Sequence, residues 1–465
     1  MLRMNDTICA PATSVGAGAI SVVRVSGPEA MAVVDRVVRF RSGDAASAPG
    51  YSVKFGVVEG LDEVLVAIFR APHSYTGEDG AEISCHASPY IVGTLLDRLS
   101  AAGCRLAEPG EFTRRAFLNG KMDLAQAEAV ADVIASATSA QHRVAMNQLR
   151  GGYSAELRKL RKQLLELTAL MELELDFSEE DVEFADRSRL RELLDTACSH
   201  CHQLADSFRL GNAIRNGVPV AIVGAPNSGK STLLNALLRD DRAIVSDVPG
   251  TTRDTVEETC VIDGVLFRFI DTAGIRESSD EVEKLGIERT FRKISEAEIV
   301  LGVVDASDSP TTMEASLRTM LDKVDFGHQK MLILANKTDK TGVNKNVTAI
   351  NNFVSSTDYK EFTIDVIEIS AKAGSGLEKL RSALVERAGI ASASGTLVTN
   401  ARHAAALREA AVSLSTVSDG LDRHISSDLL AEDLRAALAS LGSISGEITT
   451  DEVLGEIFSK FCIGK

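Results

Sequence analysis

The sequence has little of several features that mark particular classes of protein. It contains seven cysteines, an odd number scattered over 465 residues, and no tryptophan. This cysteine usage is typical of a reduced cytosolic protein and argues against a disulfide scaffold. Basic residues are outnumbered by acidic ones, 50 against 66, for a formal net charge of -16. That balance argues against a general nucleic-acid coat protein, although a local patch or a second protein would be able to supply positive surface.

Long apolar runs are also missing. The segment 7–23 carries no charge and follows directly on Asp6. Pro11, Gly16 and Gly18 interrupt it. The SVVRVSG that overlaps its end alternates like a strand, so the segment does not have the form of a signal peptide. No stretch is long and apolar enough to span a bilayer. We therefore expect a soluble, cytoplasmic protein without a membrane partner.

The last four letters, CIGK, place Cys462 fourth from the end. A prenylation signal needs aliphatic residues after the cysteine and usually an uncharged last residue, which Gly464 and Lys465 do not provide. A metal or redox cysteine, a catalytic group and a packing residue remain as interpretations.

Two clusters have both a functional and a plain structural interpretation. Arg158, Lys159, Arg161 and Lys162 are spaced along one side of a helix, and such a run is more often a solvated face than a nucleic-acid patch. The stretch ACSHCHQ at 197–203 resembles half of a zinc site. The second half is missing from the chain and the surrounding pattern is helical, so the sequence does not favour a metal there.

The hydrophobic pattern divides the chain, which is long enough for about three domains. Residues 1–118 contain alternating runs such as GAISVVRVSG, YSVKFGVVEG and EVLVAIFRAP, separated by glycine-rich turns, and these predict a compact α/β domain. Helical patterns follow over 119–214 and return over 388–465. We predict one helical domain that is split by an inserted domain at 215–387.

The first helical part has two local signals. Asp123 and Gln126 have the spacing of a capping box at the start of a helix. An apolar stripe then follows in two segments: Leu124, Ala127, Val130, Ala131 and Ile134, and later Leu157, Leu160, Leu164, Leu167 and Met171. This spacing of three and four residues is typical of helices in a bundle. The predicted fold class is thus multidomain, α/β plus all-α.

The stretch VPVAIVGAPNSGKSTLLNALL predicts a phosphate-binding loop. A β-branched run leads into Gly224-x4-Gly229-Lys230-Ser231, and a leucine-rich helical pattern follows. Glycines let backbone N–H groups point at phosphates, at a helix N-terminus whose dipole favours anions. Lys230 would reach the β and γ phosphates and Ser231 would ligate Mg²⁺.

Four further motifs follow in order, each near a strand end. PGTTRD places Thr251 and Thr252 in a switch loop, and LFRFIDTAG places Asp271 near Mg²⁺ and the Gly274 N–H near the γ-phosphate. MLILANKTD ends in Asp339, whose carboxylate can accept two hydrogen bonds from guanine. VIEISAKAG places backbone near the guanine O6. Together the five motifs predict a Ras-like P-loop GTPase domain of the translation-factor branch.

One position does not match Ras-like enzymes. The residue after the Gly274 position is normally a glutamine that orients the attacking water, but here it is Ile275. Hydrolysis must therefore take its water-positioning group and its cation from elsewhere. Local candidates are Asn227, Asp280, Glu281 and Glu283 for the water, and Arg253 and Arg276 for the cation, with a surface role equally open for each arginine.

The stretches on either side of the GTPase motifs indicate to which family of GTPases the chain is similar. SYTGEDGAEISCH, EPGEFTRRAFLNGKMDLAQAEAVADVI, LDFSEED, the GTPase motifs with PGTTRD, and EIFSKFCIGK occur in this order over essentially the whole chain. In this combination the chain resembles the MnmE (TrmE) family of tRNA-modification GTPases. The resemblance implies that residues 1–118 bind tetrahydrofolate and form a homodimer.

The resemblance also implies a reaction and its partners. With a flavoprotein of the MnmG (GidA) family, in a heterotetramer, the protein would add a (carboxymethyl)aminomethyl group to C5 of the wobble uridine of certain tRNAs. A tetrahydrofolate derivative would donate the carbon, and the partner would contribute FAD and NADH. Dimerisation of the GTPase domains on GTP binding would drive the cycle.

For the GTP site, the resemblance implies that K⁺ replaces an arginine finger and that Glu283 helps to orient the water through a second water. A cation between the phosphates neutralises charge that develops in the transition state. The expected K⁺ ligands are Asn227, Ser246, Val248 and Thr251, and the expected Mg²⁺ ligands are Ser231 and Thr252. The expected GTP contacts are Asn227, Ser228, Gly229, Lys230, Ser231, Thr232, Ser246, Asp247, Val248, Pro249, Gly250, Thr251, Thr252, Asp271, Thr272, Ala273, Gly274, Asn336, Lys337, Asp339, Ser370, Ala371 and Lys372.

For the folate site, the resemblance implies Arg24, Glu82, Lys121 and Lys465. A glutamate can hydrogen-bond the pterin ring, and basic groups can meet carboxylates. The tail would then fold back onto the N-terminal domain and bring Cys462 near the carbon donor, where a catalytic and a packing role both stay open. With Lys230 and Glu283, Cys462 completes the set of candidate catalytic residues.

One departure and two competing functions complete the sequence argument. The usual family run His-Gly-Gly is here His86-Ala87-Ser88, which bears on the fit of the folate site near Glu82 and on dimer contacts. A ribosome-assembly GTPase of the Era-like group would carry an RNA-binding domain, often basic, after the central motifs. The acidic flanks and the CIGK end argue against it. A membrane-associated GTP switch is disfavoured because the chain has no anchor or basic amphipathic helix.

Overall fold

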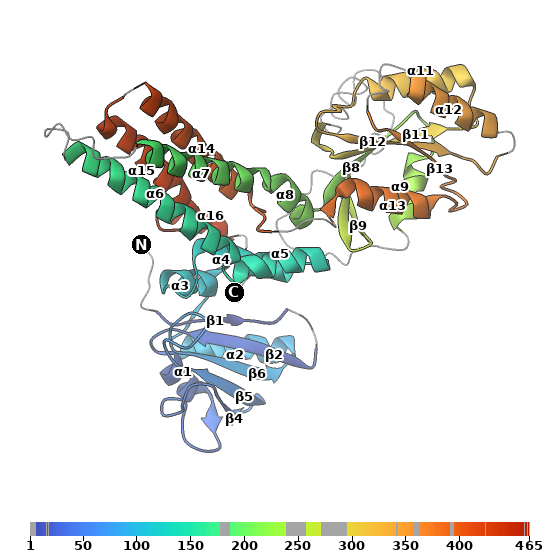
Figure 1. Ribbon diagram of the computed structural model, residues 1–465. Helices are drawn as coiled ribbons and strands as arrows, with labels where there is room; N and C mark the ends of the chain where they lie inside the picture. Colours follow the sequence, from blue (N-terminus) through green and yellow to red (C-terminus); the bar gives the residue numbers. More distant parts are fainter. Residues whose placement is uncertain are drawn as a thin grey trace, which may run out of the picture. The chain divides into compact units, whose positions relative to one another are not determined.

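The computed structural model describes residues 6–14, 16, 18–176, 187–238, 257–270, 295–340, 343–356, 362–390, 395–423, 425–459, 461–462 and 464. The chain forms two compact units (Figure 1). The first unit comprises Met1–Ala131, Gln148–Leu190 and Asp419–Lys465, and the second comprises Asp132–Asn147 and Arg191–Ser418.

The first unit contains a seven-stranded mixed sheet in the order β3-β4-β5-β6-β2-β1-β7. Its neighbours pair antiparallel except for β1 and β7, which are parallel. The strands are β1 (Ile8–Pro11), β2 (Ile20–Ser26), β3 (Arg39–Phe40), β4 (Ser52–Val58), β5 (Asp62–Phe69), β6 (Gly80–His86) and β7 (Arg105–Leu106). The three alternating runs of the sequence are confirmed as β2, β4 and β5.

Helices α1 (Ala30–Val37) and α2 (Pro89–Ala101) contact this sheet and share its apolar core. On β5 the side chains of Val64, Val66 and Ile68 are buried in that core, while Leu65 between them is 50% exposed. The alternation arises because successive side chains of a strand point to opposite faces of the sheet. One face of β5 therefore packs on the core and the other is open.

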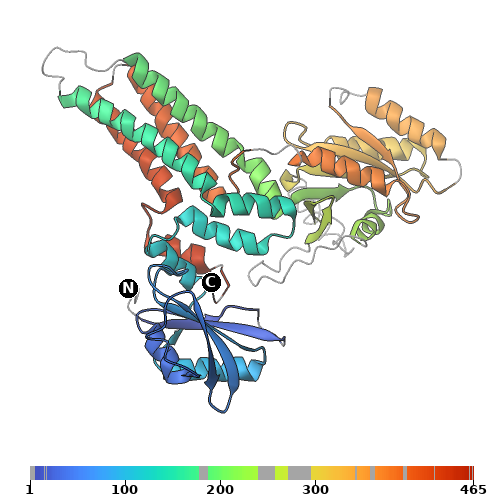
Figure 2. The ribbon, with the colours of Figure 1, turned by 60° about the horizontal axis from the view of Figure 1, so that its bottom comes forward.

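The other helices of the first unit are α3 (Glu111–Leu118), α4 (Leu124–Ala135), α6 (Gly152–Asp176), α15 (Ser427–Ser445) and α16 (Asp451–Ser459), with α4 continuing into the second unit. The predicted capping box is confirmed, because the Asp123 N–H donates to Gln126 Oε1 at 3.0 Å and the Gln126 N–H donates to Asp123 Oδ1 at 2.9 Å. The predicted stripe on α6 is also confirmed, since all five of its residues are buried. Helix α15, distant in sequence, lies beside α6 (Figures 1 and 2).

The second unit contains a six-stranded sheet in the order β13-β12-β11-β8-β10-β9, which is parallel except for the β9–β10 hairpin. Its strands are β8 (Val218–Val223), β9 (Glu257–Ile262), β10 (Val265–Ile270), β11 (Ile299–Asp305), β12 (Lys330–Asn336) and β13 (Asp365–Glu368). Its helices are α5 (Ser139–Leu149), α7 (Arg187–Asp206), α8 (Phe208–Asn216), α9 (Lys230–Leu238), α11 (Pro310–Leu321), α12 (Asn344–Ser356), α13 (Leu377–Ala388) and α14 (Ala401–Asp422). The first residues of α7 and the last residues of α5 and α14 belong to the first unit.

This second sheet is covered on both faces. Side chains of α9 and α13 belong to one core cluster and those of α11 and α12 to the other (Figure 1). The strands β11 and β12 are accordingly buried along nearly their whole length, as expected for parallel strands between two helix layers. In such sheets ligands bind outside the carboxyl ends of the strands. The predicted fold class, α/β domains combined with helical segments, is confirmed.

The stretch ACSHCHQ lies in helix α7, as its pattern predicted, and the described residues contain no cluster of three His, Cys, Asp or Glu side chains that would hold a metal ion. Within the ranges given above, no helix combines the length and the apolar character that crossing a bilayer requires.

The C-terminal segment folds back onto the N-terminal domain, as expected. Phe458 is buried in a cluster with Leu124, and α16 contacts α3. The Gly110 N–H donates to the Cys462 carbonyl oxygen at 3.4 Å. Gly464 has φ +97°, and a Cβ at this position would lie 1.9 Å from the Pro11 carbonyl oxygen. Only glycine allows the tail to approach β1 this closely.

Replacing Gly464 with alanine is therefore expected to detach the tail. Because the Cβ would collide with fixed backbone, the hydrogen bond between Cys462 and Gly110 should open, and the Gly110 amide should exchange its hydrogen about fivefold faster or more. Hydrogen exchange followed by mass spectrometry measures this. Gly395→Ala is the matched control, since Gly395 has φ +91° but nothing within 4 Å of its Cβ position. Unchanged exchange at Gly110 in Gly464→Ala would show that the tail does not depend on this contact.

Candidate functional site

The phosphate loop connects β8 to α9, as the sequence predicted. A Cβ on Gly224 would lie 2.3 Å from the Val303 carbonyl oxygen, and one on Gly229 would lie 2.2 Å from Asn336 Nδ2. The backbone of β11 thus requires glycine at position 224, and at position 229 the Asn336 side chain and a φ of +105° both favour it. Asn227 between them has φ +60°, a left-handed conformation that asparagine tolerates better than most residues.

The Lys230 ammonium group lies against the backbone of the phosphate loop. Lys230 Nζ donates to the carbonyl oxygens of Gly224 at 2.8 Å and Ala225 at 2.9 Å. Ser231 and Thr232 follow in the first turn of α9 and are exposed. Positive charge beside the amino end of a helix is a site that favours phosphate groups. The residues present fit a nucleotide phosphate with Mg²⁺ at Ser231.

One amide side chain connects the phosphate loop with the two motifs that the sequence predicts to contact guanine. Asn336, at the end of β12, is 2% exposed. Its Nδ2 donates to the Ser228 carbonyl oxygen at 2.8 Å, and its Oδ1 accepts the Ala371 N–H at 3.0 Å. Three motifs that the sequence predicted separately are thereby brought into one site.

A second connection was not predicted from the sequence. Lys337 Nζ donates to the Asn227 carbonyl oxygen at 2.8 Å and to Asp305 Oδ2 at 2.5 Å. Burial would raise the pKa of Asp305, but hydrogen bonds from Lys337 and Ser307 hold it below its usual value. The signal was present in the sequence, because Asp305 ends the buried strand IVLGVVD just as Asn336 ends the next strand.

Asp339 lies at the exposed rim of the site. Ser370 Oγ donates to its Oδ1 at 2.6 Å, and this hydrogen bond is the main reason that the pKa of Asp339 is lowered. The carboxylate is therefore ionised and held in place, ready to accept hydrogen bonds. Lys372 is exposed nearby and adds a favourable charge.

Several predicted residues lie outside the described residues. They are Ser246, Asp247, Val248, Pro249, Gly250, Thr251, Thr252, Arg253, Asp271, Thr272, Ala273, Gly274, Ile275, Arg276, Asp280, Glu281, Glu283 and Lys465. Of the expected K⁺ ligands, the structure thus describes Asn227.

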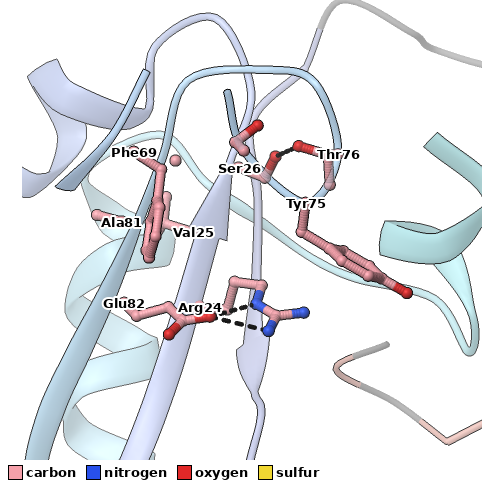
Figure 3. A pocket seen from close by; sticks show the side chains of 10 residues that line it. Arg24, Val25, Ser26, Phe69, Tyr75, Thr76, Ala81 and Glu82 are labelled. Atoms are coloured by element: carbon pink, nitrogen blue, oxygen red, sulfur yellow. Dashed lines mark hydrogen bonds and ion pairs between the residues drawn. The ribbon is translucent and has the colours of Figure 1, made fainter. Parts of the chain in front are cut away.

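The first unit has an open pocket at the ends of β2 and β6 (Figure 3). Arg24 and Glu82, predicted separately, meet here: Arg24 Nε and Nη2 donate to Glu82 Oε1 at 3.0 and 2.8 Å. The guanidinium also lies over the rings of Tyr75 at 5.1 Å and Phe112 at 5.5 Å, favourable cation–π distances. The pocket is lined by Arg24, Val25, Ser26, Phe69, Ser74, Tyr75, Thr76, Gly80, Ala81 and Glu82.

The pocket retains an acceptor for a ligand. The two hydrogen bonds from Arg24 to Glu82 both end at Oε1. The other carboxylate oxygen, Oε2, has no partner among the residues that the structure describes. Arg24 Nη1 points toward the tail and donates to the Gly464 carbonyl oxygen at 3.5 Å. The residues present therefore fit a ring with N–H donors, and they tie the pocket to the segment that carries Cys462.

Lys121 and the His86-Ala87-Ser88 run, both expected near the folate site, do not line the pocket. Lys121 Nζ donates to the Pro72 carbonyl oxygen at 2.8 Å, so it contacts the loop before Tyr75 without lining the pocket. His86 is four residues along β6 from Glu82, about 13 Å away at the usual strand rise, and its Nδ1 contacts Asp62 Oδ1 at 2.8 Å. The His86-Ala87-Ser88 departure is thus at the far end of the strand and not in the pocket.

Comparison with known proteins decides the family. The model of the GTP-binding protein TrmE N-terminus matches residues 7–121, and that of the MnmE helical domain matches residues 124–462. The chain belongs to the MnmE (TrmE) family. The MnmE relatives named "tRNA modification GTPase MnmE" include those of Christiangramia forsetii, 49% identical over 100% of both chains, and Bacteroides thetaiotaomicron, 50% identical over 99% of this chain and 100% of the relative.

The match confirms the family resemblance seen in the sequence, and with it the enzyme class, a GTPase. Among solved structures, Aquifex aeolicus Era bound to GDP and aluminium fluoride is 28% identical over 42% of this chain and 66% of its own, with a TM-score of 0.30. That overlap is too low to add to the family assignment.

Base recognition by this MnmE family member can be tested at Asp339. Asp339→Asn is expected to weaken GTP binding at least about 100-fold, because two hydrogen bonds to a charged acceptor are lost. Binding of xanthosine triphosphate should improve, since the amide nitrogen donates where the carboxylate accepted. Titration with fluorescent forms of both nucleotides measures the change. Asp325→Asn, at a surface carboxylate that contacts His328, is the control. Unchanged GTP affinity would show that Asp339 does not read the base.

Proposed function

We propose that this protein hydrolyses GTP to drive tRNA modification at the wobble uridine. With a flavoprotein of the MnmG family it would add a (carboxymethyl)aminomethyl group to C5, using a tetrahydrofolate derivative as one-carbon donor. The observation that carries the proposal is the presence of two prepared sites on one chain. Asn336 ties the phosphate loop to the base-reading motifs, and the Arg24–Glu82 pocket contacts the tail that carries Cys462.

At the GTP site the chain's own residues would bind and orient. Asp339 would select guanine, and Lys230 would move from the carbonyl oxygens of Gly224 and Ala225 to the β and γ phosphates. Ser231 and Thr252 would hold Mg²⁺, which neutralises charge on the phosphates when bound. These steps need no covalent intermediate with the protein.

The missing glutamine at Ile275 makes a second cation part of this proposal. Asn227, together with Ser246, Val248 and Thr251, would hold K⁺, and Glu283 would orient the attacking water. The described part of this set supports it, because the backbone of Asn227 is fixed from outside the loop by Lys337. The Asn227 side chain is exposed and accessible to a ligand.

Hydrolysis is therefore expected to depend on K⁺. In sodium chloride at matched ionic strength, the turnover of GTP should fall at least about 100-fold relative to potassium chloride, since one group that stabilises the transition state is lost. Phosphate release measures turnover, and nucleotide binding in both salts serves as the control. Asn227→Gly keeps the positive φ and should lose the preference for K⁺. Equal rates in both salts would contradict the cation proposal and make Arg253 and Arg276 the next residues to replace.

At the N-terminal site the pocket would hold the pterin ring. Glu82 Oε2 would accept from ring N–H groups, and Arg24 would keep Glu82 in place through its two hydrogen bonds. Lys121 and Lys465 would meet the carboxylates of the glutamate tail. The folate supplies the one-carbon unit when bound.

We propose a homodimer as the acting form, in a heterotetramer with the flavoprotein and with tRNA as substrate. Val53, Phe55 and Val57 of β4 and Leu65 of β5 project from the open face of the first sheet and are 37–64% exposed. A flat apolar face of this kind supports association with a second copy of the same chain. The mass of the complex assembled in the experiment below tests this composition.

The role of Cys462 is tested in the reconstituted system. Cys462→Ser, assayed with the flavoprotein partner, folate donor and tRNA, is expected to abolish modification of the wobble uridine while GTP hydrolysis is unchanged, because a hydroxyl is a far weaker nucleophile than a thiol. Modified nucleosides are quantified by mass spectrometry. Cys198→Ser, at a half-buried thiol of α7, is the control. Full modification by Cys462→Ser would leave this cysteine a packing role only.

A further inference from the structure

Three of the residues that line the N-terminal pocket carry aliphatic hydroxyl groups. These groups belong to Ser26, Ser74 and Thr76, and we call them the hydroxyl wall. Ser26 and Thr76 are each 2% exposed, and their oxygens are 2.7 Å apart (Figure 3). A hydroxyl has one hydrogen to donate and two lone pairs that accept. The direction of each hydrogen therefore decides what this wall presents to a ligand.

Glu78 takes up the hydrogens of Ser26 and Ser74, and Ser26 takes up that of Thr76. Ser26 Oγ donates to Glu78 Oε2 at 2.8 Å, and Ser74 Oγ donates to the Glu78 carbonyl oxygen at 2.5 Å. Because the hydrogen of Ser26 is engaged with a carboxylate, the short contact between the hydroxyls requires Thr76 to donate to Ser26. Thr76 Oγ1 in turn accepts the Glu78 N–H at 3.3 Å.

Arg115 fixes the orientation of Glu78 from behind. Its Nη1 contacts both carboxylate oxygens, at 3.3 and 3.4 Å. Arg115 is buried and also donates to Asp6 at 2.6 Å and to Glu111 at 3.0 Å. A guanidinium has donors only, so both oxygens of Glu78 act as acceptors. Glu78 Oε2 therefore accepts from Ser26 and does not donate to it. Glu78 and Arg115 do not line the pocket, and they act through the hydroxyls as positioning residues.

We propose that the hydroxyl wall and Glu82 Oε2 select a ligand ring whose edge carries N–H donors, such as the 2-amino-4-oxopyrimidine ring of a pterin. The inference rests on the folate function proposed above and assigns part of its specificity to Ser26, Thr76 and Glu78. With its hydrogens engaged, the wall offers lone pairs only. A ring edge that offers no donor leaves those lone pairs unpaired and is rejected.

The test compares two probes on the full-length protein. They are 5-formyltetrahydrofolate and its 2-desamino-2-methyl analogue, which lacks the exocyclic amine but keeps the rest of the molecule. We expect the wild-type protein to bind the parent compound about tenfold tighter or more in calorimetric titrations.

Glu78→Gln is the first variant. The Gln amide must direct its oxygen toward Arg115, so its nitrogen faces Ser26 and donates to it. The hydrogens of Ser26 and Thr76 are then released toward the pocket, and the preference for the parent compound should fall to about threefold or less. Melting temperature shows whether the variant is folded.

Thr76→Val is the second variant. Valine has nearly the shape of threonine, and this substitution, unlike Glu78→Gln, leaves the charge of the protein unchanged. It removes an acceptor from the wall, so binding of the parent compound should weaken about fivefold while binding of the analogue stays unchanged. Ser21→Ala is the matched control. Ser21 lies on the same strand, its Oγ is 2.7 Å from Thr13 Oγ1, and it does not line the pocket.

The outcomes separate the two proposals. If the wild-type protein binds neither compound, the folate function itself is wrong. If it binds both compounds equally, or if Glu78→Gln and Thr76→Val both keep the wild-type ratio, folate binding stands and the hydroxyl wall does not select the ring. Loss of the ratio in these variants, with the wild-type ratio kept in Ser21→Ala, supports the assignment.

Discussion

The buried guanidinium of Arg115 is surrounded by the carboxylates of Asp6, Glu78 and Glu111, and the N-terminal site depends on this ion cluster. Burial alone would lower the pKa of Arg115, but the charges of Glu78 and Glu111 outweigh it and raise the pKa. The cluster joins the approach to β1, the loop before β6 and the first turn of α3. Removing one partner of a buried ion pair costs about 3–5 kcal/mol, because the other charge is left without compensation. The pocket thus has a rigid base on which small hydroxyl groups can be oriented.

In the GTPase domain an uncharged side chain, the amide of Asn336, holds the loops of the site together. The amide of Asn336 has a donor nitrogen and an acceptor oxygen, and each holds another loop, at Ser228 and at Ala371. A buried polar side chain must satisfy both groups, so the three loops have one relative arrangement. Lys337 adds the link to Asn227. The end of β12 and the phosphate loop are therefore connected through two adjacent residues.

The tail reaches the N-terminal domain through a close backbone approach. Gly464 lies against the Pro11 carbonyl oxygen, and Arg24 contacts both the tail and Glu82. A side chain at position 464 would keep the two apart. Of the CIGK end, the described residues Cys462 and Gly464 thus lie against the N-terminal domain, at Gly110 and Pro11.

The sequence alone determined the features that depend on local spacing. The strand, glycine loop and helix around Lys230, the capping box at Asp123 and the buried stripe of α6 follow from which residues recur at fixed intervals, since backbone geometry sets those intervals. Only the tertiary structure decided which distant groups meet. Arg24 and Glu82 are 58 residues apart, and Asp305 and Lys337 are 32 apart. No periodicity records such pairs, because they arise when neighbouring strands are aligned in register and the packed core leaves one position for each side chain.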